Sequence, residues 1–162
     1  MEIPARALRV LSGALRDTDA RRFVQGDATI TCLSGNPGTG KTIAACEWLL
    51  SREDGLFVTA SGLSRIDRAL VSRVLKAPAL VLDDMGTEYL DPKGFVLSLL
   101  DELMDYRYRS LLPLVLTTNL DIESFKARYG ARLVDRIRGA GRFVRIGGAS
   151  MRGEAGSAGA LS

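Results

Sequence analysis

The sequence predicts an α/β fold with a parallel sheet, because segments of strand character alternate with segments of helical periodicity. Two segments carry most of this prediction. Residues 28–33 (ATITCL) form a β-rich run that leads directly into a glycine-rich loop and a helical pattern. Residues 79–82 form an apolar run that ends in two carboxylates, as in strands buried on both faces of a parallel sheet. We expect five strands, at residues 28–33, 56–60, 79–82, 114–117 and 143–146.

The expected helices lie between these strands and cover both faces of the sheet. Ser64 is the expected cap of one helix, and Pro92 fits the first turn of a long helix that ends near Tyr108. Asp121 begins a further helix and Gly130 ends it. Helices are expected at residues 5–15, 41–51, 64–76, 92–108, 121–129 and 131–138, the first with Leu8, Leu11 and Leu15 at helical spacing.

The glycine-rich loop reads GNPGTGKT and fits G-x-x-x-x-G-K-[ST], the phosphate-binding motif of P-loop nucleoside triphosphatases. Its backbone can wrap closely around phosphate oxygens, and its amides can form an anion-binding nest before the following helix. Lys41 is expected to bind the β- and γ-phosphates, and the Thr42 hydroxyl to bind Mg²⁺. The alternative is a glycine-rich turn that precedes Lys-Thr by chance. The candidate nucleotide-binding residues are Gly35, Asn36, Pro37, Gly38, Thr39, Gly40, Lys41 and Thr42.

Asp83 and Asp84 follow the third apolar run, at the edge where open α/β sheets bind ligands. We expect Asp83 to hold Mg²⁺ through water and Asp84 to polarise the water that attacks the γ-phosphate. Apolar residues before an aspartate are common, so a plain strand end is the alternative. The glycine loop upstream favours the catalytic interpretation.

Asn119 follows the fourth strand, and its amide can orient a water because it both donates and accepts hydrogen bonds. The alternative is a helix cap, since a helix begins at Asp121. Upstream, residues 106–109 (YRYR) interleave tyrosine with arginine. This pattern suggests a nucleic-acid surface or, more commonly, a helix end with amphipathic side chains.

The composition is that of a single globular domain of 162 residues. The net charge of +3 does not by itself indicate nucleic-acid binding, and the absence of histidine excludes histidine-based catalysis and histidine-ligated metals. Cys32 and Cys46 are expected to be buried thiols. No segment resembles a signal peptide or a membrane span, so we expect a cytoplasmic protein without membrane contact.

Basic residues are concentrated between Lys126 and Arg152, where eight basic residues accompany one acid, Asp135. Three interpretations are open: a solvated face, a phosphate contact across a subunit interface, or a DNA-facing surface. Residues 1–27 are expected to form a short N-terminal helical segment, and residues 153–162, rich in Gly, Ala and Ser, a disordered tail.

The chain resembles AAA+ ATPases of the DnaC/DnaI helicase-loader type and their IstB-type relatives. The resemblance is carried by LVLDDMGTEYL, YRYRSLLPLVLTTNL and YGARLVDRIRG, and covers residues 28–152, the expected ATPase core. It implies the strand order 5-1-4-3-2 and no helical lid. It also implies that Gly35–Thr42 is the Walker A element, Asp83-Asp84 the Walker B element and Asn119 sensor 1.

The resemblance further implies a site shared between subunits. Arg136 matches the arginine finger that reaches the nucleotide of a neighbouring subunit, and Arg132 is a second candidate. Ser150-Met151-Arg152 resembles the closing Ser-aromatic-Arg of the loaders. The sequence departs from the pattern in having Asp84 where many AAA+ proteins have glutamate. Residues 1–27 also contain no counterpart of the loaders' helicase-binding domain.

The expected activity is slow hydrolysis of ATP to ADP and phosphate with Mg²⁺, in DNA replication. The expected partners are further copies of the chain, a replicative helicase and single-stranded DNA. The alternative is an ATP-operated assembly switch with little turnover, such as an IstB-type transposition helper. The candidate catalytic residues are Lys41, Asp84, Asn119 and Arg136, and the candidate metal ligands are Thr42 and Asp83.

Overall fold

The computed structural model describes residues 2–13, 18–25 and 28–148. The strands are β1 (Ile30–Ser34), β2 (Gly55–Thr59), β3 (Ala79–Met85), β4 (Leu114–Thr118) and β5 (Gly141–Arg145). The helices are α1 (Ala5–Leu11), α2 (Asp19–Val24), α3 (Lys41–Leu50), α4 (Ala60–Leu63), α5 (Arg68–Lys76), α6 (Phe95–Arg109), α7 (Ile122–Tyr129) and α8 (Ala131–Ala140). The expected Ser150-Met151-Arg152 motif and the expected tail at 153–162 lie outside the described residues.

The strands form one parallel sheet in the order β2-β3-β4-β1-β5. This confirms the predicted order, read from the opposite edge. Because β1 lies between β4 and β5, the loop that follows it leaves from the interior of the sheet. In the described part of the chain only residues 146–148 follow β5, and they form no helix.

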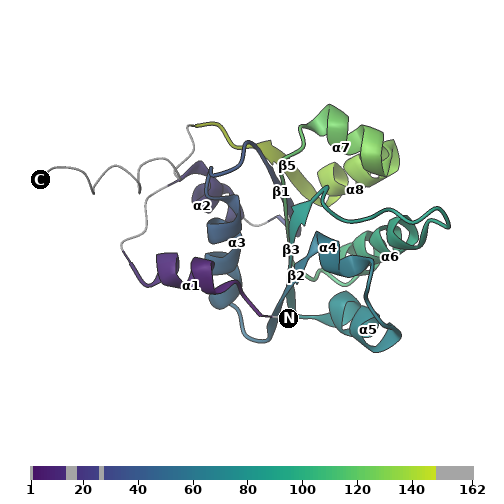
Figure 1. Cartoon of the computed structure of the whole chain (residues 1–162), viewed down its shortest axis with the longest axis horizontal. Coiled ribbons are helices and arrows are strands. Elements are labelled where there is room, and N and C mark those ends of the chain that lie inside the picture. Colours follow the sequence, from purple (N-terminus) through teal and green to yellow (C-terminus); the bar gives the residue numbers. More distant parts are fainter. Residues whose placement is uncertain (1, 14–17, 26–27, 149–162) are drawn as a thin grey trace, which may run out of the picture.

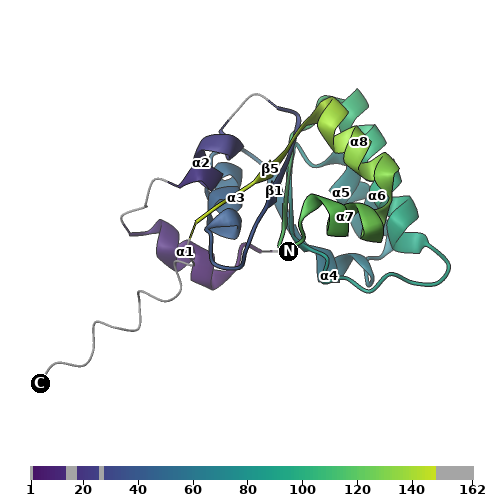
Figure 2. The same ribbon diagram turned by 90° about the horizontal axis from the view of Figure 1, so that it is seen from above.

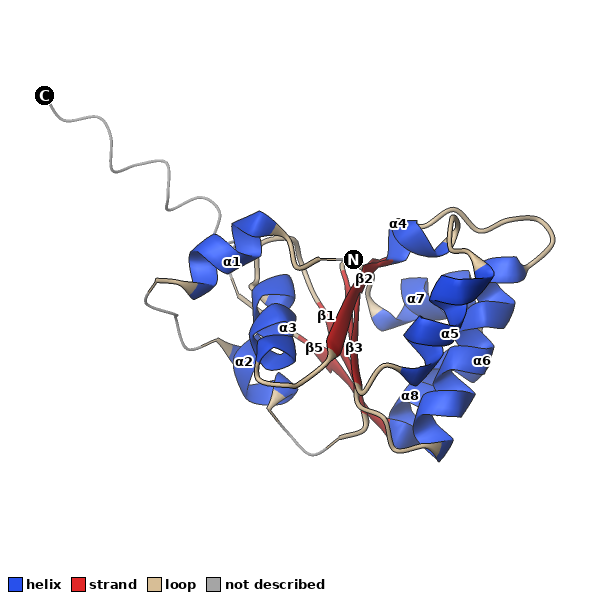
Figure 3. Ribbon diagram, turned by 90° about the horizontal axis from the view of Figure 1, so that it is seen from below, coloured by secondary structure: helices blue, strands red, loops and turns tan. Residues whose placement is uncertain are grey.

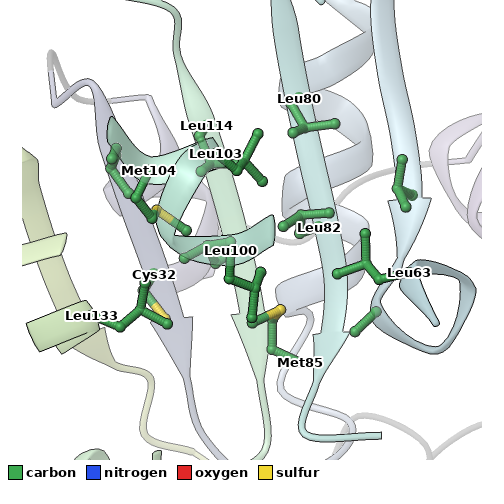
Figure 4. Packing of buried hydrophobic residues seen from close by; sticks show 14 of the residues in the cluster. Cys32, Leu63, Leu80, Leu82, Met85, Leu100, Leu103, Met104, Leu114 and Leu133 are labelled. Atoms are coloured by element: carbon green, nitrogen blue, oxygen red, sulfur yellow. The ribbon is translucent and has the colours of Figure 1, made fainter. Parts of the chain in front are cut away.

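Helices cover both faces of the sheet, with α1, α2 and α3 on one face and α4 to α8 on the other (Figure 1, Figure 2). Each strand contributes to both cores because successive side chains point to opposite faces. Leu33 and Val81 belong to the core with α3, and Leu82 to the core with α6. Figure 4 shows Leu100 and Leu103 among the side chains of this second core. Burial on both faces explains the apolar runs in β1 to β4, whereas β5 (GRFVR) is only partly buried.

Two predicted helix starts are wrong, because in each case a nearby aspartate carboxylate accepts first-turn amides of a helix that begins further along the chain. The segment after β2 forms α4 and then α5, and the cap of α5 is Asp67 instead of Ser64: its carboxylate accepts a first-turn amide at 2.8 Å. Helix α6 begins at Phe95 instead of Pro92, since the Asp91 carboxylate accepts two first-turn amides at 3.0 and 3.1 Å. A carboxylate satisfies amides that have no helical acceptor and also interacts favourably with the helix dipole.

The N-terminal helices pack on α3 (Figure 3). Leu8, one of the three leucines at helical spacing, is 45% exposed, and the buried residue of this helix is Ala7. The helix ends at Leu11, and the expected core residue Leu15 lies outside the described residues. Within residues 2–13, 18–25 and 28–148, every helix is too short or too polar to cross a bilayer.

Arg107, one of the residues considered for a nucleic-acid surface, is fully buried. Its guanidinium donates to the carbonyls of Ala77 and Pro113, which precede β3 and β4, at 2.9 and 2.6 Å. It also donates to the carbonyls of Val74 and Leu75, each at 3.3 Å. Burial lowers its pKa to about 10, so the side chain remains charged at neutral pH. Arg107 joins the starts of two strands, and the nucleic-acid interpretation of this residue is wrong.

Candidate functional site

The loop from Gly35 to Thr42 lies at the carboxyl end of β1 and leads into α3. Gly40 has a φ of 84°, in the left-handed region that favours glycine. Gly35 approaches the chain after β5 so closely that a β-carbon would lie 2.4 Å from the carbonyl oxygen of Ile146. The Ala44 amide donates to the Gly40 carbonyl at 2.9 Å. The earlier amides of the first turn have no acceptor within the helix and are available to an anion in the loop.

Lys41 is the buried cation of this loop, with only 6% of its surface exposed. Its ammonium donates to the carbonyls of Gly35 and Asn36 at 2.8 and 2.9 Å, and to the Thr39 hydroxyl at 3.3 Å. An ammonium at this place in the loop can form charge-assisted hydrogen bonds to a phosphate that binds there.

Thr42 and Asp83 meet where α3 begins beside β3. The Thr42 hydroxyl donates to Asp83 Oδ1 at 2.8 Å, and the Thr117 hydroxyl of β4 donates to the same oxygen at 2.7 Å. Burial raises the pKa of Asp83 above its ordinary value, although both hydroxyl hydrogen bonds act in the opposite direction. Hydroxyl and carboxylate oxygens fit Mg²⁺, which binds one or two carboxylates together with phosphate oxygens and water.

Asp83 and Asp84 share the carboxyl edge of the sheet because β3 contains a bulge. The register with β4 shifts between Leu82 and Met85, so both aspartates face the single residue Thr117. In a regular strand their side chains would point to opposite faces, and a bulge re-aims one of them. Asp84 has a φ of 61°, and its amide donates to the Thr117 hydroxyl at 2.9 Å. Sequence reasoning missed Thr117; a hydroxyl at the end of an otherwise apolar strand is the signal that could have identified it.

Asn119 lies beside Asp84 at the end of β4. Its side-chain amide donates to Asp84 Oδ1 at 3.4 Å. The helix-cap alternative is wrong, since the cap of α7 is Asp121, whose carboxylate accepts the Ser124 amide at 2.7 Å. The predicted residues that the fold gathers at this edge are Lys41, Thr42, Asp83, Asp84 and Asn119.

Arg136, the predicted arginine finger, lies on α8 against α6. Its guanidinium is 2.5 Å from Asp105 Oδ1 and donates to the Asp101 carbonyl at 3.1 Å. Arg132 pairs with the Asp101 carboxylate at 3.7 Å and is 70% exposed, whereas Arg136 is 23% exposed. Both arginines therefore pair with acids of their own chain, outside the group of residues at the nucleotide loop.

The basic segment that follows Lys126 is partly neutralised, because α6 supplies acids to Arg132 and Arg136, and Glu88 pairs with Arg128. A second basic group was missed in the sequence. It lies on α5 and the turn before it, and none of its members forms an ion pair with a described residue. Its exposed residues are Arg65, Arg68, Arg73 and Lys76.

Solved structures similar to this chain include a helicase loader and a replication initiator. The DnaC helicase loader superposes with a TM-score of 0.70 and 23% identity over 89% of this chain and 100% of that chain. DnaI has a TM-score of 0.69 and 25% identity over 92% and 94%. AMPPCP-bound DnaA from Aquifex aeolicus has a TM-score of 0.65 and 15% identity over 85% of this chain and 49% of that chain. No protein-family model and no curated protein sequence matches the chain.

Proposed function

We propose that this chain, which has the AAA+ fold of the DnaC type, binds ATP with Mg²⁺ at Gly35–Thr42 and hydrolyses it to ADP and phosphate. The observation that carries the proposal is the 2.8 Å hydrogen bond between the Thr42 hydroxyl and the Asp83 carboxylate, beside the buried ammonium of Lys41. In this arrangement a cation that can bind phosphate and oxygen atoms that can bind Mg²⁺ lie together at the Gly35–Thr42 loop.

Each residue of the edge has a separate role in the proposed reaction. The amides before Ala44 bind phosphate oxygens, and Lys41 exchanges neutral carbonyl acceptors for phosphate. Thr42 and Asp83 hold Mg²⁺, which when bound neutralises charge on the phosphates. Asp84 orients and polarises the attacking water, and Asn119, within 3.4 Å of Asp84, fixes the position of that water.

The second half of the proposed site comes from a neighbouring copy of the chain. Arg136 on α8 is the finger, with Arg132 as the second candidate. The pairs with Asp101 and Asp105 hold both side chains on the surface of α6 until a neighbour's phosphates compete for them. Turnover should therefore depend on protein concentration.

A role in DNA replication is proposed from the similarity to DnaC, DnaI and DnaA. The expected partners are a replicative helicase and single-stranded DNA, and one solved DnaA is bound to AMPPCP and single-stranded DNA. The exposed and unneutralised cations of α5 fit a phosphate backbone better than the paired arginines of α8.

Nucleotide binding is tested by titrating a fluorescent ATP analogue with and without Mg²⁺ and by measuring phosphate release over a range of protein concentrations. Lys41→Ala should weaken binding by about 100-fold or more, since it removes a buried cation aimed at phosphate. Lys93→Ala, in the exposed loop before α6, is the matched control. Equal affinity of Lys41→Ala and wild type would overturn the site. Nucleotide-dependent assembly without phosphate release would instead support the switch alternative.

DNA binding is tested by fluorescence anisotropy with an oligothymidylate and a non-hydrolysable ATP analogue at low salt. The double variant Arg68→Ala/Arg73→Ala should bind more weakly. The slope of the logarithm of its binding constant against the logarithm of the salt concentration should be smaller by about two. Lys126→Ala with Arg138→Ala removes two exposed cations of the other basic segment. A larger loss in this second pair would place the DNA on α7 and α8 instead of α5. If the wild-type protein binds no DNA, the DNA-binding part of the proposal fails.

A further inference from the structure

Glu88, in the turn after β3, is a buried acid whose side chain is completely inaccessible to solvent. Its Oε2 accepts the amide of Gly86 at 2.9 Å. Its Oε1 accepts the Tyr129 hydroxyl and lies 3.7 Å from Nε of Arg128. Arg128 also donates through Nη2 to the Glu88 carbonyl. The carboxylate therefore bridges the turn to the last residues of α7.

Burying a carboxylate is costly unless it is paired and hydrogen-bonded. Here Arg128 supplies the opposite charge, and the phenol of Tyr129 supplies a donor from a residue that is 8% exposed. Burial, and then the bond to Glu88, raise the pKa of Tyr129 above its ordinary value, so the hydroxyl stays protonated. Two successive residues of α7 thus hold one acid of the turn.

The same turn fixes the conformation of Asp84. Asp84 has a φ of 61°, and its carbonyl accepts the Thr87 hydroxyl at 2.8 Å. On the strand side, its amide bonds to Thr117. On the other side, the bond from the Gly86 amide to Glu88 fixes the peptide that follows Met85. Glu88 is the member of this turn that connects it to a helix packed on the sheet.

We propose that Glu88 is a positioning residue for Asp84, anchored on α7 by Tyr129 and Arg128. The inference rests on the proposed ATPase function. Without the anchor, the turn loses its fixed geometry, and the Asp84 carboxylate loses its place beside Asn119. Glu88 does not contact nucleotide in this role; it acts through the backbone of the turn.

The test compares Tyr129→Phe and Glu88→Gln with wild type in nucleotide affinity, kcat and thermal stability. A small displacement of a catalytic group is enough to lower kcat by about tenfold or more, while nucleotide affinity should stay within about twofold. Tyr108→Phe, at a tyrosine that is 53% exposed, and Glu123→Gln, at an exposed glutamate of α7, are the matched controls. A purely structural role would lower the Tm and leave kcat unchanged below the transition.

Hydrogen exchange provides a readout that does not need activity. Tyr129→Phe should speed exchange in the peptide that spans Asp84 to Glu88 by about tenfold and leave the Gly35–Thr42 peptide unchanged. Wild-type kcat or wild-type exchange in Tyr129→Phe would overturn the positioning role. If wild type binds no nucleotide in the assay that includes Lys41→Ala, the proposed function fails, and exchange alone then decides whether Glu88 anchors the turn.

Discussion

Lys41 and Arg136, the two cations predicted to act on phosphate, are held in opposite ways. Lys41 is buried, its ammonium donates to the carbonyls of Gly35 and Asn36 and to the Thr39 hydroxyl, and its charge also interacts with Asp83. Arg136 is on the surface of α6, 2.5 Å from the Asp105 carboxylate. A phosphate that binds Lys41 displaces neutral acceptors, whereas a phosphate that binds Arg136 must displace a carboxylate.

The nucleotide loop and the edge of the sheet form a preformed part of the proposed site, whereas the arginines of α8 are kept from phosphate by ion pairs. The loop and the edge of the sheet are already connected by hydrogen bonds in a single chain, from Thr42 through Asp83 and Thr117 to Asp84. Arg132 and Arg136 of α8 are paired with acids of the same chain. We therefore expect nucleotide binding by one chain and turnover only in an assembly.

The largest effect is expected for Arg136→Ala. We expect a fall in phosphate release of about 10³-fold at protein concentrations that support assembly, because an arginine finger stabilises the charge of the transition state. Nucleotide affinity, measured by titration, should change little. Arg138→Ala, an exposed arginine of the same helix, is the control. Unchanged turnover in Arg136→Ala would assign the finger to Arg132 or remove it altogether.

Asp84→Asn is expected to lower turnover by about 100-fold, since the amide cannot polarise water as a carboxylate does. Asparagine tolerates the φ of 61° at this position, so the fold is preserved. Asp54→Asn is the matched control, because Asp54 is an exposed aspartate with a φ of 54°. Phosphate release at the wild-type rate in Asp84→Asn would show that another group activates the water.

Asp105→Asn weakens the pair that holds Arg136 and should raise turnover at limiting protein concentration by about two- to fivefold, in line with the strength of exposed ion pairs. The measurement is phosphate release as a function of protein concentration. Asp135→Asn, an exposed acid of α8, is the control. If Asp105→Asn is slower than wild type, Asp105 positions the arginine instead of restraining it.

The smallest effect is expected for Asp83→Asn without nucleotide. Because burial raises the pKa of Asp83, the ionised form destabilises the fold, and this penalty appears as the pH rises through the raised pKa. Asp83→Asn should therefore have the higher Tm near pH 8, and the difference should shrink as the pH is lowered. The rise in Tm that Mg²⁺ and nucleotide produce in the wild-type protein should be lost in Asp83→Asn. A lower Tm near pH 8 would contradict the penalty.

The parts of the molecule that could be predicted from the sequence are those whose determinants are contiguous. The glycine loop and the aspartate pair each lie within a few consecutive residues, so the sequence motif contains all the residues that the chemistry needs. Strand order came instead from the resemblance to AAA+ proteins, since the sequence pattern does not show which strands pair. The helix starts at Ser64 and Pro92 were wrong because Asp67 caps α5 and because the Asp91 carboxylate accepts first-turn amides of α6, which begins after Gly94.

The missed residues are contacts between distant segments. Thr117 supports Asp83 and Asp84 across the β3–β4 register, and Tyr129 reaches Glu88 from the far end of α7. Within its own segment, Thr117 looks like an ordinary strand residue and Tyr129 like an ordinary residue on the buried face of a helix. Their roles follow only from the bulge in β3 and from the packing of α7 beside the turn.

The position of β1 in the sheet sets an order of events during synthesis of the chain. Both neighbours of β1, which are β4 and β5, are translated long after it, whereas β2 and β3 pair with each other. A nascent chain that has not yet emerged beyond Leu114 has no sheet partner for Ile30–Ser34. The proposed nucleotide site, which depends on β1 being held in the sheet, can therefore form only after Leu114–Thr118 has left the ribosome.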